Sequence, residues 1–419
     1  MIDLNVLGKR AKKAAAEISS LSDEKINDAL VSCAVKIRNN CAYLKEENAK
    51  DISRAVEKGL SAAFIDRLTL TDAVIESIAD GIEQVARLTS PRGKTVYSYR
   101  NEKQDIYVEK RNVPFGVVGM IYESRPNVTA DAFALCFKTA NAVMLKGGSD
   151  ALRSNAAIVK LIKESLKECG VTEDAVILIE DTDRETTAAF MKLDKYLDLL
   201  IPRGGASLIK SAVENATVPI IETGTGNCHV YVDKFADTDM TAEVIFNAKT
   251  QRYSVCNACE SLVIHKDVLS AALPKIAARL GEKNVEMRCD ERSYEVIKDY
   301  KYLARATEED FYTEYGAAII SVKTVDGIKE AVEHINRCCT HHSESIITAD
   351  DARAQYFMDS IDSSSVYHNA STRFSDGFVF GLGAEIGIST QKLHARGPMG
   401  LEALVTTKYY VKGNGSVRK

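Results

Sequence analysis

Short apolar runs alternate with helix-like segments along the middle of this 419-residue chain, and this alternation limits its fold more than any other feature. Buried strands separated by helices form a doubly wound parallel sheet, whose ligands bind beyond the carboxyl ends of the strands. The pattern therefore predicts an α/β fold with its binding site at that edge. The predicted strands cover residues 113–122, 141–149, 175–179, 197–201 and 219–221, and the predicted helices cover residues 126–140, 154–169, 185–191 and 207–214.

A second alternating block, between residues 262 and 350, predicts a second α/β domain. Residues 3–89 are predicted to be helical, because apolar side chains recur there at helical spacing, and Ser22 and Thr71 are predicted to start two of the helices. The glycine-rich residues 372–400 are predicted to be mostly loop. In the second block the predicted helices cover residues 268–280, 291–303 and 326–337, and the predicted strands cover residues 317–322 and 345–348.

Two further strands are predicted outside these blocks. Residues 104–112 alternate apolar and charged side chains, and residues 404–411 close the chain as a strand. A two-faced strand of this kind can pair with a second copy of the chain, or it can be an ordinary sheet edge. The sequence leaves both interpretations open.

Composition limits the class of function. The net charge of −5 gives no basic surface for nucleic acid. No apolar run is long enough to span a bilayer, and the first five residues lack the pattern of a signal peptide. The ten cysteines are scattered, as in proteins of a reducing cytosol. We therefore expect a cytoplasmic protein with neither a membrane nor a nucleic acid as its partner.

Two strand ends carry groups that suit a nucleotide. Lys146 precedes Gly147 and Gly148, which places a cation beside a turn without side-chain obstruction. The glycines in residues 202–207 would let a helix N-terminus offer backbone N–H groups to a phosphate. Simple turn chemistry is the alternative for both, since no G-x-G-x-x-G pattern is present.

The stretch from Ser254 to His265 places Cys256 between a helix-like run and an apolar strand. A cysteine on such a turn can face a cleft and act as a nucleophile, although most free cysteines are small buried hydrophobic residues. Cys256 and Cys259 also have a zinc-like spacing. The other local cluster, residues 338–342, lacks the usual ligand spacing, so we expect no metal.

Five segments carry a resemblance to a known family. Together they resemble the aldehyde dehydrogenase superfamily and, within it, the γ-glutamyl phosphate reductase family, over nearly the whole chain. The resemblance implies a dinucleotide-binding domain with a doubly wound parallel sheet, a second α/β domain with the catalytic cysteine, and a small β oligomerisation arm. The segments are residues 122–129, 222–229, 254–258, 380–389 and 392–401.

These parts are expected at definite positions in the chain. Residues 1–230 would form the NADP-binding domain, interrupted by the arm at residues 103–115. Residues 231–370 would form the catalytic domain. Residues 371–403 would return to the first domain, and residues 404–419 would supply the terminal strand of the arm.

The resemblance implies NADPH-dependent reduction of L-γ-glutamyl 5-phosphate to L-glutamate 5-semialdehyde in proline biosynthesis, through a thioester on Cys256. The backbone N–H of Cys256 and the amide of Asn127 would stabilise the oxyanion. Alternatively, Asn127 caps the helix that begins at Val128. Glu222 matches the carboxylate that activates water in hydrolytic relatives, and here it is either structural or a proton carrier.

The resemblance also implies residues that bind the cofactor. Lys146 would hold the adenosine ribose, Gly204 and Gly205 would lie near the pyrophosphate, and Glu314 would contact the nicotinamide ribose. No acidic residue directly follows Lys146 to repel a 2′-phosphate, which favours NADP over NAD.

Substrate recognition is assigned to three arginines. Arg125 would bind the acyl phosphate, Arg373 would clamp the α-carboxylate, and Arg396 would form a second anion site. A surface arginine is the alternative for Arg373. We also expect a homo-oligomer, a dimer or larger, and a functional association with glutamate 5-kinase.

Two rival functions remain. One is an aldehyde-oxidising enzyme that hydrolyses its thioester. It is disfavoured because no Gly-Gln pair precedes Cys256 and because residues 380–389 match the reductases. The other is a scaffold without activity, against which the presence of Cys256 and Lys146 counts. Tyr253 departs from the family, which more often has proline there.

Overall fold

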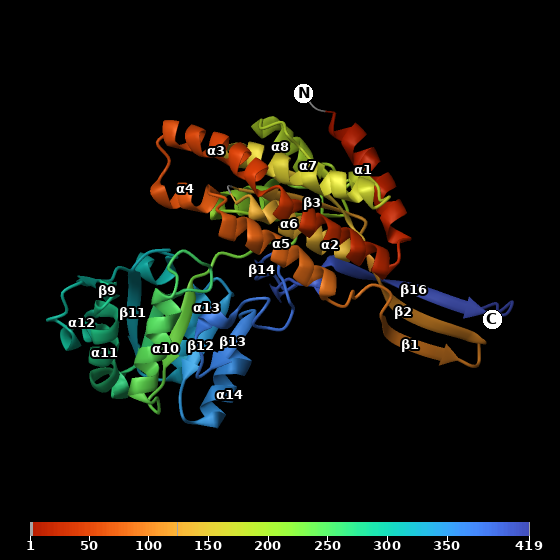
Figure 1. The fold of residues 1–419 in the computed structure, drawn as a ribbon. Coiled ribbons are helices and arrows are strands. Elements are labelled where there is room, and N and C mark those ends of the chain that lie inside the picture. Colours follow the sequence, from red (N-terminus) through yellow and green to blue (C-terminus); the bar gives the residue numbers. More distant parts are fainter. Residues whose placement is uncertain (1–2, 124, 419) are drawn as a thin grey trace. The chain divides into compact units, whose positions relative to one another are not determined.

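The structure is a computed structural model that describes residues 3–123 and 125–418. The chain forms two compact units (Figure 1). Unit 1 comprises Met1–Glu222, Gly381–Gly387 and Met399–Lys419, and unit 2 comprises Thr223–Phe380 and Ile388–Pro398. The expected boundaries at residues 230 and 370 differ from these, because residues 223–230 and 371–380 belong to unit 2. The expected return segment, residues 371–403, is divided between both units.

The described residues of unit 1 form a four-stranded parallel sheet in the order β5-β4-β3-β6. Every residue of β3 and β4 is buried, which explains their continuous apolar sequence. The predicted run 113–122 is split, because Gly116 adopts a φ of +125° and redirects the chain. The predicted strand 219–221 is reduced to one bridge between Ile220 and Leu200. The strands are β3 (Val117–Tyr122), β4 (Ala142–Gly147), β5 (Val176–Leu178) and β6 (Leu199–Arg203).

Helices cover this sheet in layers (Figure 1). Helices α1, α6 and α7 contact its strands, and α2, α3 and α5 pack on those helices. The predicted helix starts are confirmed, because Ser22 accepts from Lys25 N–H and Thr71 accepts from Val74 N–H. The helices are α1 (Leu4–Ser19), α2 (Asp23–Asn39), α3 (Cys41–Glu57), α4 (Ala62–Leu68), α5 (Asp72–Arg87), α6 (Asn127–Lys138), α7 (Leu152–Glu168), α8 (Arg184–Met191) and α9 (Ala206–Asn215).

A separate antiparallel sheet in unit 1 has the order β1-β2-β16. It consists of β1 (Thr95–Asn101), β2 (Ile106–Pro114) and β16 (Val405–Gly413). The two predicted strands therefore pair with each other, with Val405 opposite Pro114 and Gly413 opposite Ile106. The sequence did not predict β1, whose side chains are nearly all exposed.

Unit 2 is built on a seven-stranded parallel sheet in the order β10-β9-β11-β8-β7-β12-β13. The predicted helix 291–303 begins as expected but is too long, because α12 ends at Val296 and the chain reaches β10 at Leu303. The sequence also missed β9, β13 and α14. The strands are β7 (Cys228–Val232), β8 (Cys259–His265), β9 (Glu286–Cys289), β10 (Leu303–Arg305), β11 (Ile319–Val325), β12 (Ser343–Ile347) and β13 (Ser365–His368), and the helices are α10 (Thr238–Thr250), α11 (Lys266–Gly281), α12 (Glu291–Val296), α13 (Ile328–Cys338) and α14 (Asp351–Ser360).

Successive residues of the central strands of unit 2 enter two different cores. Val230 and Leu262 pack with apolar residues of α10 and α11. Tyr231 and Val263, one position further on, pack with residues of α13 and α14, including Phe357. Both faces of the sheet are therefore covered by helices. No helix in the described ranges is long and apolar enough to cross a membrane.

Candidate active site

Cys256 lies at the corner of a tight turn between α10 and β8. The N–H of Ala258 donates to the carbonyl of Val255 at 3.0 Å, so Cys256 and Asn257 are the two central residues of a β-turn. The side chain of Cys256 is half-buried, whereas Cys259, which begins β8, is fully buried. The thiol of Cys256 is therefore partly accessible to solvent, whereas the thiol of Cys259 packs in the core.

The backbone at Gly226 packs closely against the backbone of Cys256 in this turn. A Cβ added at Gly226 would lie 1.4 Å from the carbonyl oxygen and 2.7 Å from the Cα of Cys256. No side chain fits there, since both neighbouring atoms belong to the main chain. The thiol of Cys228 donates to the same carbonyl oxygen at a sulfur–oxygen distance of 3.2 Å.

The other side of the turn is tied to the segment that carries Arg373. The Asn257 amide donates to the carbonyls of Ser375, at 2.9 Å, and Arg373, at 3.3 Å. The hydroxyl of Thr372 donates to the carbonyl of Asn257 at 2.8 Å. These hydrogen bonds tie the turn around Cys256 to the segment that carries Arg373.

Arg373 lines a pocket of about 420 Å³ within unit 2. Its Nε donates to Oε1 of Gln251 at 2.8 Å, which fixes one edge of the guanidinium. Burial lowers the pKa of Arg373, and the Cys256 thiol lies close enough to oppose that shift. The pocket therefore offers a cation near the thiol, as carboxylate recognition and thiolate stabilisation both require. The lining includes Asn247, Gln251, Ser371, Arg373, Phe374 and Val379.

The two other predicted site residues of unit 2 lie in different surroundings. Glu314 is exposed between Tyr312 and β11. Arg396 donates to the Asp362 carboxylate at 2.9 Å, so its guanidinium is already engaged by an acid. Tyr253, the departure from the family pattern, packs against the core of unit 2.

A buried ion pair lies close in sequence to the turn around Cys256. Lys249 Nζ and the Glu260 carboxylate are 2.5 Å apart, and both side chains are fully buried. Gly316 N–H also donates to Glu260, at 3.2 Å. Burial raises the pKa of Glu260 to about 7, while Lys249 opposes this shift. The pair ties α10, β8 and the segment after Glu314 together.

The predicted phosphate-binding groups of unit 1 meet at one sheet edge. Tyr122, at the end of β3, lies opposite Gly147 of β4 and opposite Arg203 of β6. Lys146 is buried at this edge. Burial lowers its pKa, and the charges of two aspartates that follow β5 oppose that effect. The carboxylates that raise the pKa of Lys146 are therefore Asp181 and Asp183, which are distant from it in sequence.

The start of α9 already accommodates an anionic group. The N–H of Gly205 donates to the Glu123 carboxylate at 3.2 Å, and a Cβ added at Gly205 would meet nothing within 4 Å. At Gly204, by contrast, a Cβ would lie 2.7 Å from the Glu123 side chain. The N-terminus of α9 therefore binds an anionic oxygen, and a dinucleotide phosphate bound there would take the place of the Glu123 carboxylate.

Asn127 is the first residue of α6 and does not cap it. Pro126 is the N-cap and no side chain caps this helix, so the alternative role proposed for Asn127 is wrong. Its amide donates to Asp131 at 3.1 Å, which leaves the second N–H of the NH₂ group for another acceptor. Arg125 lies in the tight connection before α6, where its N–H donates to the carbonyl of Glu123 at 2.7 Å.

The pKa of Asp131 allows a pH-dependent test of the contact between Asn127 and Asp131. Burial raises its pKa to about 6, while the Asn127 amide and the charge of Arg203 oppose the shift. The folded state therefore binds more protons than the unfolded chain between about pH 4 and pH 6. We expect the free energy of unfolding of the wild type, relative to Asp131→Asn, to fall as the pH rises through this window. Urea unfolding of both proteins at pH 4, 5, 6 and 7 measures it, and a constant difference would contradict the assignment.

Sequence reasoning missed three residues that shape these sites: Gly226, Cys228 and Glu123. All three lie in motifs that carried the resemblance, yet none was given a role. The repeated glycines before Cys228 were the available signal. In the described ranges, no group of three His, Cys, Asp or Glu residues could hold a metal ion.

Comparison with known proteins places the chain in a family. Residues 4–295 match the model of the aldehyde dehydrogenase family. The γ-glutamyl phosphate reductases of Caldicellulosiruptor bescii and Lachnospira eligens are 50% identical over 420 residues and 52% identical over 419, with 100% of each chain covered. This chain belongs to the γ-glutamyl phosphate reductase family.

A solved structure of the γ-glutamyl phosphate reductase family agrees with this fold throughout. The crystal structure of the Thermotoga maritima protein is 43% identical, is covered in full in both chains, and gives a TM-score of 0.97. The predicted resemblance and the aldehyde dehydrogenase-like fold class are confirmed. The roles of individual site residues in this member of the γ-glutamyl phosphate reductase family stay predictions.

Proposed function

We propose that this chain reduces L-γ-glutamyl 5-phosphate to L-glutamate 5-semialdehyde with NADPH, releasing phosphate, as a cytoplasmic step of proline biosynthesis. Relatives of the same length bear the name γ-glutamyl phosphate reductase. The observation that carries the proposal is the half-buried Cys256 at the corner of a firmly held turn, within electrostatic reach of Arg373.

The thiolate of Cys256 attacks the acyl carbon, and the bond from that carbon to the phosphate oxygen breaks. Phosphate leaves with the electron pair, and a thioester remains on Cys256. A dinucleotide held by the residues of unit 1 would supply the hydride for reduction of this thioester. The carbon–sulfur bond then breaks, which releases the aldehyde and regenerates the thiolate. The N–H of Cys256 and the second N–H of Asn127 are the proposed donors to the oxyanion, and Glu222 is the proposed proton carrier.

The residues assigned to NADP supply a cation, Lys146, and the N-terminus of α9. Lys146 would hold the ribose, Gly204 and Gly205 would lie beside the pyrophosphate, and Glu314 would contact the nicotinamide ribose. We expect kcat/KM for NADP to exceed the value for NAD, which would support the proposed preference for NADP. The reverse order would contradict it.

Arg373 is the proposed clamp for the substrate α-carboxylate, with Arg125 assigned to the acyl phosphate. Arg396 is proposed as a second anion site, where a substrate anion would compete with the Asp362 carboxylate for its guanidinium. We expect Arg373→Met to raise the KM for glutamate semialdehyde about 10- to 100-fold, because a charge-assisted hydrogen bond is lost. Propionaldehyde, which has no α-carboxylate, is the control substrate, and its KM should not change. An equal loss with both aldehydes would assign Arg373 to the structure of the turn.

Self-association is proposed through the β1-β2-β16 sheet. Its outer strands have free edges within the described chain, and β1 and β16 expose tyrosines at positions 97, 99 and 409. Extension of this sheet by a second copy would give a dimer or larger assembly. A functional association with glutamate 5-kinase, which supplies the unstable acyl phosphate, is proposed on chemical grounds alone.

Phosphate dependence distinguishes the proposed function from its rivals. In the oxidative direction, glutamate semialdehyde and NADP should give sustained NADPH formation only with phosphate or arsenate. Oxidation at the same rate without either anion would indicate a hydrolytic aldehyde dehydrogenase. Iodoacetamide tests the scaffold alternative, which predicts that Cys256 reacts no faster than Cys169.

A further inference from the structure

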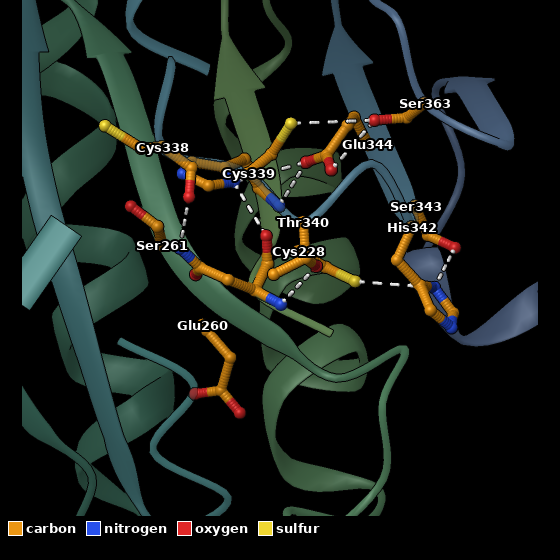
Figure 2. A network of polar contacts seen from close by, with 12 residues as sticks. Cys228, Glu260, Ser261, Cys338, Cys339, Thr340, His342, Ser343, Glu344 and Ser363 are labelled. Atoms are coloured by element: carbon orange, nitrogen blue, oxygen red, sulfur yellow. Dashed lines mark hydrogen bonds and ion pairs between the residues drawn. The ribbon is translucent and has the colours of Figure 1, made fainter. Parts of the chain in front are cut away.

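A buried polar network of unit 2 contains Cys228, His342 and Ser343, whose contacts Figure 2 shows, and it also reaches the turn around Cys256. The Cys228 sulfur lies 3.2 Å from the carbonyl oxygen of Cys256 and 3.8 Å from Nδ1 of His342. The same His342 nitrogen lies 2.8 Å from the hydroxyl of Ser343, which bonds to the hydroxyl of Ser375. The Ser375 carbonyl accepts from Asn257, so the network returns to the turn where it began.

We propose that Cys228 is a positioning residue whose thiol holds the Cys256 carbonyl and thereby fixes the direction of the nucleophilic sulfur. The inference rests on the proposed function only in taking Cys256 as the nucleophile. Cys228 is fully buried, so the role proposed for it is to position Cys256.

The irregular pairing of β7 with β8 places Cys228 under the turn. Cys228 lies opposite Cys259, but His229 lies opposite Ser261, so one residue of β8 is passed over. Bulges of this kind re-aim side chains beside functional sites. Burial also raises the pKa of Cys228 well above its ordinary value. Cys228 therefore remains a thiol, which can donate a hydrogen bond and does not compete as a nucleophile.

The contacts restrain both sides of one peptide unit. The Cys228 thiol holds the carbonyl of Cys256, and Ser375 and Thr372 hold the side chain and carbonyl of Asn257. Rotation about the Cα–C bond of Cys256 is therefore restricted. Because the sulfur is attached through the same Cα, a rotation there would swing it away from the acyl carbon.

Three variants test the inference. Cys228→Ala removes the donor, Cys228→Ser keeps a donor, and Cys259→Ala is the matched control, because Cys259 is an equally buried thiol that donates to Ser261 instead. We expect Cys228→Ala to lower kcat about 10- to 100-fold, because the nucleophile would be misplaced. The KM values for glutamate semialdehyde and NADP should not change. Cys228→Ser should recover most of that loss, and Cys259→Ala should retain the wild-type kcat.

Each other outcome overturns the proposal. A Cys228→Ala protein with lowered Tm but wild-type kcat would show that the thiol serves packing alone. A serine variant as slow as the alanine variant would show that donation is not the cause. If the alanine variant is insoluble, Cys228→Val, which keeps more of the volume without a donor, replaces it. Failure of the proposed function is distinguishable, because the wild-type protein would then form NADPH from glutamate semialdehyde and NADP without phosphate, or would form none at all, whatever the Cys228 variants do.

Discussion

Cys256→Ala is expected to lower kcat by roughly 10⁴-fold or more, because no acyl-enzyme can form without the nucleophile. The turn should persist, since the Ala258 N–H bond to Val255, the Asn257 contacts and the Gly226 approach do not involve the sulfur of Cys256. The variant should therefore bind NADPH as the wild type does. Steady-state kinetics and NADPH fluorescence titration measure the two properties.

Cys259→Ala provides the comparison for this loss. It removes a thiol three residues away that is buried in the core of unit 2. We expect a loss of stability from the cavity, about 1 kcal/mol or more, with kcat close to wild type. A Cys256→Ala protein with kcat within tenfold of wild type would contradict the nucleophile assignment.

Gly226→Ala is expected to be the second most damaging substitution. The new Cβ would lie 1.4 Å from the Cys256 carbonyl oxygen, and a backbone atom cannot rotate away as a flexible side chain can. The turn must shift by more than an ångström, for which we expect a fall in kcat of about 100-fold or more. Forced overpacking should also lower the free energy of unfolding by about 1–3 kcal/mol.

Gly327→Ala is the matched control in the same unit. Gly327 is extended, with a φ of −175°, and a Cβ there would meet nothing within 4 Å. It should therefore retain wild-type kcat. Wild-type kcat in Gly226→Ala would show that the close approach does not fix the nucleophile.

The fold was predictable wherever strands are buried on both faces or helices carry clear start signals. The continuous apolar sequences of β3 and β4 and the caps at Ser22 and Thr71 are examples. The sequence failed at β1, because nearly all of its side chains are exposed and leave no apolar alternation. It also failed after Val296, where β10 spans only three residues and carries too little pattern to oppose a helix.

The site was predictable only as far as motifs reach. The motifs give Cys256 and Lys146 predicted roles, but they do not predict the contacts that hold the turn around Cys256. Gly226 and Cys228 lie about thirty residues before the turn, and they reach it only through the shifted pairing of β7 with β8. The cap proposed for Asn127 failed because Pro126 takes that position. Such contacts depend on strand register, which local sequence does not specify.

A phosphate-free burst measures the central claim most directly. Wild-type protein, glutamate semialdehyde and NADP are mixed without phosphate, and NADPH is followed before and after phosphate is added. A thioester on Cys256 predicts a rapid burst of about one NADPH per subunit, then a slow phase, and sustained turnover once phosphate arrives. Cys256→Ala should give no burst. Sustained NADPH formation before phosphate is added, or a burst that survives in Cys256→Ala, would contradict the account.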